Sequence, residues 1–128
     1  PVIVLGGPAD AARVNHVAQA IGAEGIAEEG FARTFGALAR GAMAVGGDTG
    51  LTHLCAASGI PTVGVFGPTT SRDGFWHWQG VAVELPLPCR PCSRFGSDRC
   101  PIGDHACMQA LPAAAVIAAL QPPASART

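Results

Sequence analysis

A glycine-rich turn between a strand-like run and a helix-like run constrains this chain more than any other feature. Apolar residues 42–45 lead into the turn Gly46-Gly47-Asp48-Thr49-Gly50, and residues 51–58 continue it as a helix-like run. A helix that starts directly after such a turn leaves its first backbone N–H groups unpaired. Together with the positive end of the helix dipole, these groups favour an anion. The turn therefore predicts a phosphate site, and phosphate is the part by which proteins commonly hold a nucleotide.

Strand-like and helix-like runs alternate along the rest of the chain. Strands are expected at residues 1–5, very briefly at 25–26, and at 42–45, 61–66 and 81–85. This alternation is typical of βαβ units and predicts an α/β fold, with a Rossmann-like, mainly parallel sheet and flanking helices. In such a sheet the glycine turns after Leu5, Val45 and Phe66 would lie at one edge, where ligands bind.

Three of the expected helices carry an apolar face at helical spacing. Asp10 is expected to start the first helix and Pro112 to open the last. The residues predicted to face the core are Val14, Val17, Ala18 and Ile21 in the first helix, Phe31, Thr34, Phe35 and Leu38 in the second, and Val116, Ile117 and Leu120 in the last.

The composition bounds the class of protein. With 128 residues, 48% apolar and 13% charged, the chain is long and apolar enough for one globular domain. Eight basic residues, all arginine, face nine acidic ones, so no positive field favours nucleic acid or an anionic membrane. Because the chain starts in a strand-like run without Met, we expect a fragment whose partner half lies upstream.

The order of the motifs resembles one known family. Gly6-Gly7-Pro8 with Asp10 is followed by the run from Asp48 to His53, then by Gly59-Ile60-Pro61 and Phe66-Gly67-Pro68-Thr69. Over roughly residues 2–120 this pattern is similar to the C-terminal, donor-binding half of the lipopolysaccharide heptosyltransferases, glycosyltransferase family 9. The run from Asp48 to His53, with the downstream Phe-Gly-Pro-Thr, is the specific part of the resemblance.

The resemblance implies a two-domain GT-B enzyme with two Rossmann-like halves facing across a cleft. Residues 1–120 would bind an ADP-heptose donor, with a cysteine-rich loop at 86–107 and a frayed tail at 121–128. The missing N-terminal half would bind the lipid A–core acceptor and carry the general base, so that this chain alone would not turn over. Transfer would invert the anomeric centre and would require no cofactor. The protein would be cytoplasmic and would reach the inner membrane only through the missing half.

Carried onto this sequence, the resemblance implies a set of donor-binding residues: Asp10, Asp48, Thr49, Gly50, Leu51, His53 and Thr69. The backbone N–H groups from Thr49 to Leu51 would hold the diphosphate. Asp48 would lie near the sugar or its phosphate ester, and Asp10 would accept hydrogen bonds from the ribose hydroxyls. A lysine that the family places on the diphosphate is missing, because the chain has no lysine.

Simpler roles stay open for the same residues. Asp10 and Asp48 suit a helix N-cap or a turn without any ligand. His53 suits a structural histidine as well as it suits a ligand contact, and turn chemistry alone explains Thr69. A non-catalytic nucleotide-binding or zinc-stabilised interaction domain is therefore the competing function, and a family member with another sugar donor is a third.

Four cysteines close in sequence form the second informative pattern: Cys89, Cys92, Cys100 and Cys107. The spacing is compatible with a structural zinc held by four thiolates. Arg90, Arg94 and Arg99 lie among them and would favour the thiolate form. Two disulfides and four reduced thiols are the alternatives. Cys55, on a helix face, is expected to be a small core residue.

Overall fold

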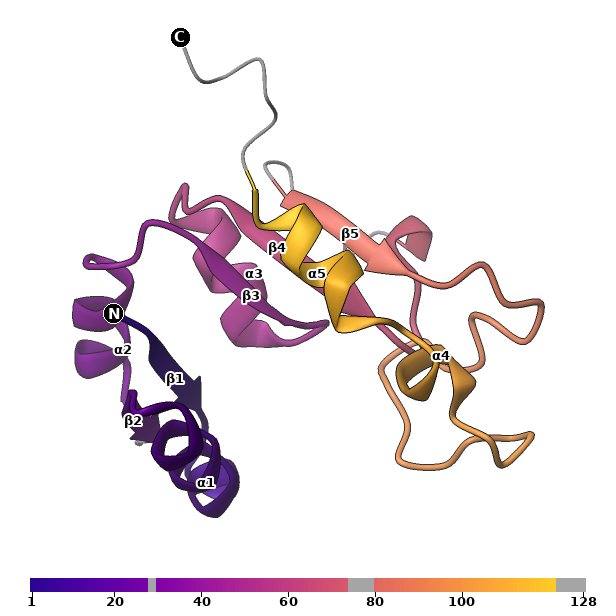
Figure 1. Cartoon of the computed structure of the whole chain (residues 1–128), viewed down its shortest axis with the longest axis horizontal. Coiled ribbons are helices and arrows are strands. Elements are labelled where there is room, and N and C mark those ends of the chain that lie inside the picture. Colours follow the sequence, from indigo (N-terminus) through magenta and orange to yellow (C-terminus); the bar gives the residue numbers. More distant parts are fainter. Residues whose placement is uncertain (28–29, 74–79, 122–128) are drawn as a thin grey trace, which may run out of the picture. The chain divides into compact units, whose positions relative to one another are not determined.

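The computed structural model describes residues 1–27, 30–73 and 80–121 of the chain (Figure 1). The chain divides into two compact units, Pro1–Gly41 and Ala42–Thr128, each with its own sheet. Of the tail expected to be frayed, residues 122–128 lie outside the described residues. Within the described part, no helix is long and apolar enough to cross a lipid bilayer.

The first unit is a parallel β-α-β arrangement followed by a second helix. Its elements in chain order are β1 (Ile3–Gly6), the 3-10 helix η1 (Pro8–Asp10), α1 (Ala11–Ile21), β2 (Glu24–Ala27) and α2 (Phe31–Leu38). β1 and β2 pair in parallel, with Leu5 opposite Ile26. α1 is buried at Val14 and Ala18, and it ends at Gly22, whose φ of 66° lies in the left-handed region that favours glycine.

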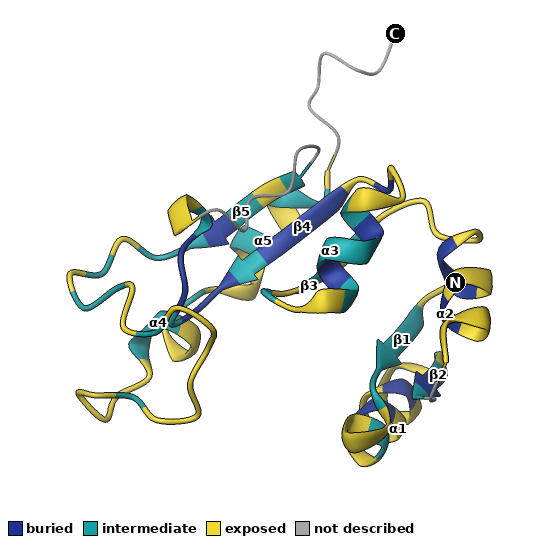
Figure 2. Cartoon of the chain, turned by 180° about the vertical axis from the view of Figure 1, so that it is seen from behind, coloured by how far each residue is buried: buried dark blue, intermediate teal, exposed yellow. Residues whose placement is uncertain are grey.

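The second unit is a three-stranded parallel sheet with helices on both faces. Its elements in chain order are β3 (Ala44–Gly47), α3 (Gly50–Ala57), β4 (Thr62–Phe66), the 3-10 helix η2 (Ser71–Asp73), β5 (Gly80–Glu84), α4 (Ala106–Gln109) and α5 (Ala113–Ala119). The strand order is β3-β4-β5, with Val63 opposite both Val45 and Val81. Figure 2 shows β4 in the middle as the most buried strand, and its last residue, Phe66, is fully buried. α3 lies on one face of the sheet and α5 on the other (Figures 1 and 2).

The predicted α/β class with parallel strands and flanking helices is confirmed. The turns after Val45 and Phe66 share one edge, because β3 and β4 are parallel neighbours. The turn after Leu5 follows a strand of the other sheet, β1-β2. The single edge predicted for all three turns is thus confirmed for two of them.

The helical faces predicted to be buried are only partly covered. Val14, Ala18, Thr34 and Leu38 are buried, as predicted. Five other residues of the predicted faces are exposed: Val17, Ile21, Phe31, Phe35 and Ile117. Phe31 and Phe35 pack on each other instead, with ring centroids 6.0 Å apart. Helical periodicity identifies residues that share a face, but it does not determine what covers that face.

Candidate functional site

The start of α3 presents open backbone N–H groups at the carboxyl edge of the second sheet. Thr49 is the N-cap, with extended backbone angles, and its side chain makes no capping hydrogen bond. The N–H of Thr49 donates to the Gly47 carbonyl at 2.9 Å, and the N–H of His53 donates to the Thr49 carbonyl at 3.1 Å. The N–H groups of Gly50, Leu51 and Thr52 precede that first helical bond and have no intrahelical acceptor. Within the described residues, no side chain accepts a hydrogen bond from these three N–H groups.

Packing behind the turn fixes the position of this helix start. Thr52 is buried, and its hydroxyl lies 3.2 Å from the Thr49 hydroxyl. A Cβ atom on Gly46 would lie only 2.3 Å from Thr52 Oγ1, so glycine is needed there for α3 to come this close to β3. Thr49 and Gly50 themselves are exposed. The first turn of α3 is therefore packed against β3 through Thr52 and exposed at Thr49 and Gly50.

Asp48 and His53 form a pair across the same turn. His53 Nε2 lies 3.0 Å from Asp48 Oδ1, and the two side chains are 33% and 12% exposed. In the tautomer that carries its proton on Nε2, His53 can donate this hydrogen bond to the carboxylate oxygen. The alternative in which Asp48 is the helix N-cap is wrong, since Thr49 holds that position. The pair links Asp48, the residue before the N-cap, to the first turn of the helix.

The segment after β4 lies beside this turn, because β3 and β4 are neighbours with Gly47 opposite Val65. Thr69 is 3% exposed, so its side chain is covered by protein, and its proposed contact with a ligand stays a prediction. The hydroxyl of Thr70 donates to Asp73 Oδ2 at 2.9 Å. An open pocket of about 400 Å³ adjoins this segment, lined by Asp73 and residues 91–94.

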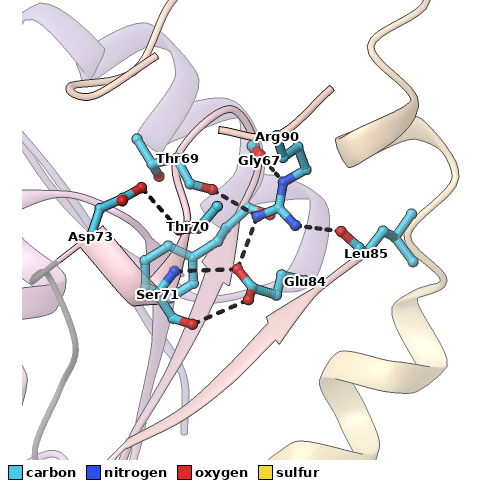
Figure 3. Close-up of polar contacts among 9 residues, drawn as sticks. Gly67, Thr69, Thr70, Ser71, Asp73, Glu84, Leu85 and Arg90 are labelled. Atoms are coloured by element: carbon cyan, nitrogen blue, oxygen red, sulfur yellow. Dashed lines mark hydrogen bonds and ion pairs between the residues drawn. The ribbon is translucent and has the colours of Figure 1, made fainter. Parts of the chain in front are cut away.

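A buried arginine that the sequence did not single out as a site residue ties this segment in place (Figure 3). The Arg90 side chain is 4% exposed and forms an ion pair with Glu84, Nη2 to Oε2, at 2.9 Å. Glu84 in turn accepts hydrogen bonds from the Ser71 backbone at 3.3 Å and the Ser71 hydroxyl at 3.1 Å. One signal was available: Glu84 is the only charged residue of β5, and a carboxylate at the end of an apolar strand needs a cation.

The environment of Glu84 favours its ionised form. Burial alone would raise the pKa of this carboxyl group, but the hydrogen bonds from Arg90 and Ser71 outweigh it and hold the pKa below its ordinary value of 4.5. The Arg90–Glu84 pair is therefore charged at neutral pH, and the attraction between β5 and the cysteine-rich loop is electrostatic as well as hydrogen-bonded.

Asp10, the candidate ribose ligand, lies in the first unit. It is the N-cap of α1 but makes no side-chain capping bond. Its carboxylate is half exposed and contacts Arg13, Nη1 to Oδ1, at 3.3 Å. Asp10 and Arg13 line an open pocket of about 210 Å³ whose other walls are residues of β1 and α1. The carboxylate is accessible to a ligand, as a ribose-binding role requires.

The four cysteines of the predicted zinc site do not assemble into a metal-binding group. Among the described residues, which include Cys89, Cys92, Cys100 and Cys107, no three His, Cys, Asp or Glu side chains are grouped so as to hold a metal. All four thiols are free. The structure thus gives no support to zinc at these residues, and the zinc proposal stays untested.

At Cys100, a backbone hydrogen bond, and not an arginine, is the main influence that favours the thiolate. A hydrogen bond from the backbone of His105 is the main cause that lowers the pKa of Cys100, against a smaller opposing effect of desolvation. Arg90 points to carbonyl oxygens and Glu84, and Arg94 lies over the Phe95 ring at 5.9 Å. Cys55 is buried, as expected for a core residue, and burial raises the pKa of its thiol.

Comparisons with known proteins agree with this geometry. A family model described as glycosyltransferase family 9 (heptosyltransferase) matches residues 1–99. Lipooligosaccharide heptosyltransferase 2 of Campylobacter jejuni is 36% identical over 66 residues, which are 50% of this chain and 20% of that protein. Lipopolysaccharide heptosyltransferase 1 of Pseudomonas aeruginosa is 44% identical over 55 residues, 42% of this chain and 15% of that protein. No solved structure matches the chain.

These relatives are much longer than the segments they share with this chain, which cover a fifth of their length or less. The family match, in contrast, extends over most of the chain and includes all of the first unit, the α3 turn and the segment after β4. The resemblance carried by the glycine turns is therefore confirmed, and the chain belongs to glycosyltransferase family 9.

Proposed function

We propose that this chain is the donor-binding part of an inverting glycosyltransferase that transfers heptose from ADP-heptose to the lipopolysaccharide inner core. Family membership and the heptosyltransferase names of the relatives support the reaction class. The observation that carries the site is the open start of α3, whose N–H groups have no side-chain partner within the described residues. An exposed helix start of this kind suits a diphosphate.

In this proposal the N–H groups of Gly50, Leu51 and Thr52 bind the donor diphosphate. They would also stabilise the negative charge that develops on it as the leaving group, because fixed dipoles aimed at developing charge lower a transition state. No metal would be needed at the diphosphate. Asp48, oriented by His53, would lie near the sugar, and Asp10 would accept hydrogen bonds from the ribose.

The acceptor side of the reaction would belong to a preceding domain. That domain would bind the lipid A–core acceptor and supply the carboxylate that deprotonates its hydroxyl group. The present chain by itself would bind donor without turnover. The enzyme would work in the cytoplasm and contact the inner membrane through that other domain.

The test of the diphosphate site removes the backbone N–H group of Gly50. Gly50 is the first residue of α3, where proline is tolerated, and the extended angles of Thr49 (φ −137°, ψ 160°) are those that a following proline favours. Gly50→Pro therefore removes one N–H and keeps the helix. Gly50→Ala is the matched control, because it keeps the N–H and its Cβ would have no other atom within 4 Å.

Calorimetric titration with ADP should show binding by the wild type and by Gly50→Ala. Loss of one hydrogen bond to a charged group costs about 1.5–3 kcal/mol, so Gly50→Pro should bind roughly 10- to 100-fold more weakly. Equal affinity of the two variants, each folded by circular dichroism, would remove the diphosphate role of α3. No binding by the folded wild type would remove the donor-binding role altogether.

A non-catalytic nucleotide-binding domain and a different sugar remain the competing functions. Both predict the same ADP titration and differ in turnover. The full-length protein, supplied with ADP-heptose and a heptose-free core acceptor, should release ADP. ADP release with another ADP-sugar alone would change the donor, and no release with any of them would leave a binding domain.

A further inference from the structure

Four consecutive carbonyl groups, starting at the last residue of β4, all accept hydrogen bonds from one later segment of the chain. The carbonyls of Phe66, Gly67 and Thr69 accept hydrogen bonds from the Arg90 guanidinium group (Figure 3). The remaining carbonyl, of Pro68, accepts from the backbone N–H groups of Cys92 at 3.0 Å and Ser93 at 3.3 Å. Residues 90–93 thus hold residues 66–69 along the whole length of the turn.

Arg90 joins this turn to the end of β5 at the same time. Its Nη1 donates to the Leu85 carbonyl, and its Nη2 is 2.9 Å from Glu84 Oε2. A planar guanidinium fork can donate in several fixed directions at once, which a lysine ammonium cannot reproduce. Because the side chain is 4% exposed, these bonds form away from water, where geometry matters most.

Glu84, which is bound to Arg90, also fixes Ser71 at the end of the turn. Its two carboxylate oxygens accept from the N–H and the hydroxyl of Ser71, the first residue of η2. Residues 67–71, which we call the β4 loop, are therefore fixed at both ends by one ion pair. Packing adds a third constraint, because a Cβ on Gly67 would lie 2.8 Å from Met108 Sδ and 3.7 Å from Cys107 Sγ.

The β4 loop lies next to the proposed diphosphate site. β3 and β4 are adjacent parallel strands, so the loop leaves the sheet at the same edge as the turn into α3. A loop at that place sets the shape of the site even if none of its side chains touches the ligand. A small displacement of such a wall can weaken binding strongly.

We propose that Arg90 is a positioning residue of the donor site: through the carbonyls of the β4 loop and through Glu84, it fixes the wall beside the start of α3. This inference rests on the proposed function. It also gives the cysteine-rich loop a role in transfer, which is to deliver Arg90 to the sheet edge.

The decisive variant is Arg90→Lys, compared with Arg99→Met as a control. Lysine keeps the positive charge beside Glu84, so the chain should fold, but it cannot bind the carbonyls of the β4 loop together. Arg99 is exposed and belongs to the same loop of the chain. Arg90→Met, which also removes the charge, is the stronger variant, and Arg90→Lys decides the question if Arg90→Met does not fold.

Two readouts are taken on each folded variant. Calorimetric titration with ADP should show roughly tenfold weaker binding or more for Arg90→Lys and wild-type binding for Arg99→Met. Hydrogen exchange followed by mass spectrometry should be faster in residues 67–71 of Arg90→Lys and unchanged in β1 and α1 of the first unit. A general loss of stability would instead raise exchange in α3 and α5 as well.

The outcomes separate this inference from the function on which it rests. If the wild type does not bind ADP, the proposed function fails. If the wild type binds ADP and Arg90→Lys binds it equally well, the donor-binding role stands and the positioning role of Arg90 is overturned. Weaker binding by Arg90→Lys with faster exchange confined to residues 67–71 supports both.

Discussion

Two turns at one edge of the second sheet treat their backbone polar groups in opposite ways. At the start of α3, the N–H groups of Gly50, Leu51 and Thr52 have no side-chain partner among the described residues. At the end of β4 and in the β4 loop, every carbonyl from Phe66 to Thr69 accepts a hydrogen bond from residues 90–93. An unpaired backbone group is costly only where water cannot reach it. Thr49 and Gly50 are exposed at the first turn (the open turn), whereas the carbonyls of the second turn (the closed turn) are paired within the chain.

In our account, the start of α3 binds the ligand, and the β4 loop supports the wall beside it. The start of α3 has N–H groups that an anion can accept from, whereas the carbonyls of residues 66–69 already accept hydrogen bonds within the chain. Arg90, whose side chain is 4% exposed, reaches the second turn from the cysteine-rich loop. A substitution at Gly46 disturbs the start of α3, and a substitution at Glu84 disturbs the β4 loop.

The largest effect on stability is expected at Gly46. A Cβ there would lie 2.3 Å from Thr52 Oγ1, and the threonine is only 5% exposed, so its hydroxyl would have to shift among packed neighbours. Gly46→Ala should therefore destabilise the fold by roughly 2–3 kcal/mol, as overpacking does. Urea denaturation measures the loss. Gly50→Ala, which is unobstructed, is the control and should change stability little. Similar values for the two variants would mean that Gly46 does not anchor α3.

A smaller, pH-dependent effect is expected at Glu84. Because its pKa in the folded state lies below the ordinary value of 4.5, folding favours the ionised carboxylate. Its contribution to stability is therefore fully present above about pH 4.5 and is lost as pH falls through the folded-state pKa. Glu84→Gln should cost about 1–2 kcal/mol at pH 7.

The measurement for Glu84 is urea denaturation of the wild type and Glu84→Gln at several pH values. The difference in unfolding free energy should shrink as the solution becomes more acidic and approach zero once the wild-type carboxylate is protonated. A difference that stays constant between pH 7 and pH 3 would show that the ion pair with Arg90 does not supply the stability of the β4 loop.

The open turn could be predicted from the sequence because its causes are local. An apolar run, a glycine turn and a helix-like run follow one another in residues 42–58, and their order alone implies N–H groups without intrahelical acceptors. The family resemblance depended on the same local runs. The α/β class followed from the alternation of the elements, which is also a property of neighbouring residues.

The closed turn could not be predicted, because its causes lie far apart in sequence. Arg90 is 23 residues from Gly67 and 21 from Thr69, and nothing near Arg90 identifies those carbonyls as its partners. The cysteines show a related limit: their spacing suits zinc, but spacing does not decide whether four side chains converge, and the zinc proposal stays untested. The exposed Phe31 and Phe35 show the same limit, since a helical face can be recognised from sequence while its cover cannot.

The most direct test of the open turn is nuclear magnetic resonance of the 15N-labelled chain during a titration with ADP. The backbone amide signals of Gly50, Leu51 and Thr52 should shift more than those of the other residues of α3 and reach saturation together, with the same affinity as in calorimetry. If ADP binds while these three signals stay in place, the diphosphate lies elsewhere, and the start of α3 is not the diphosphate site.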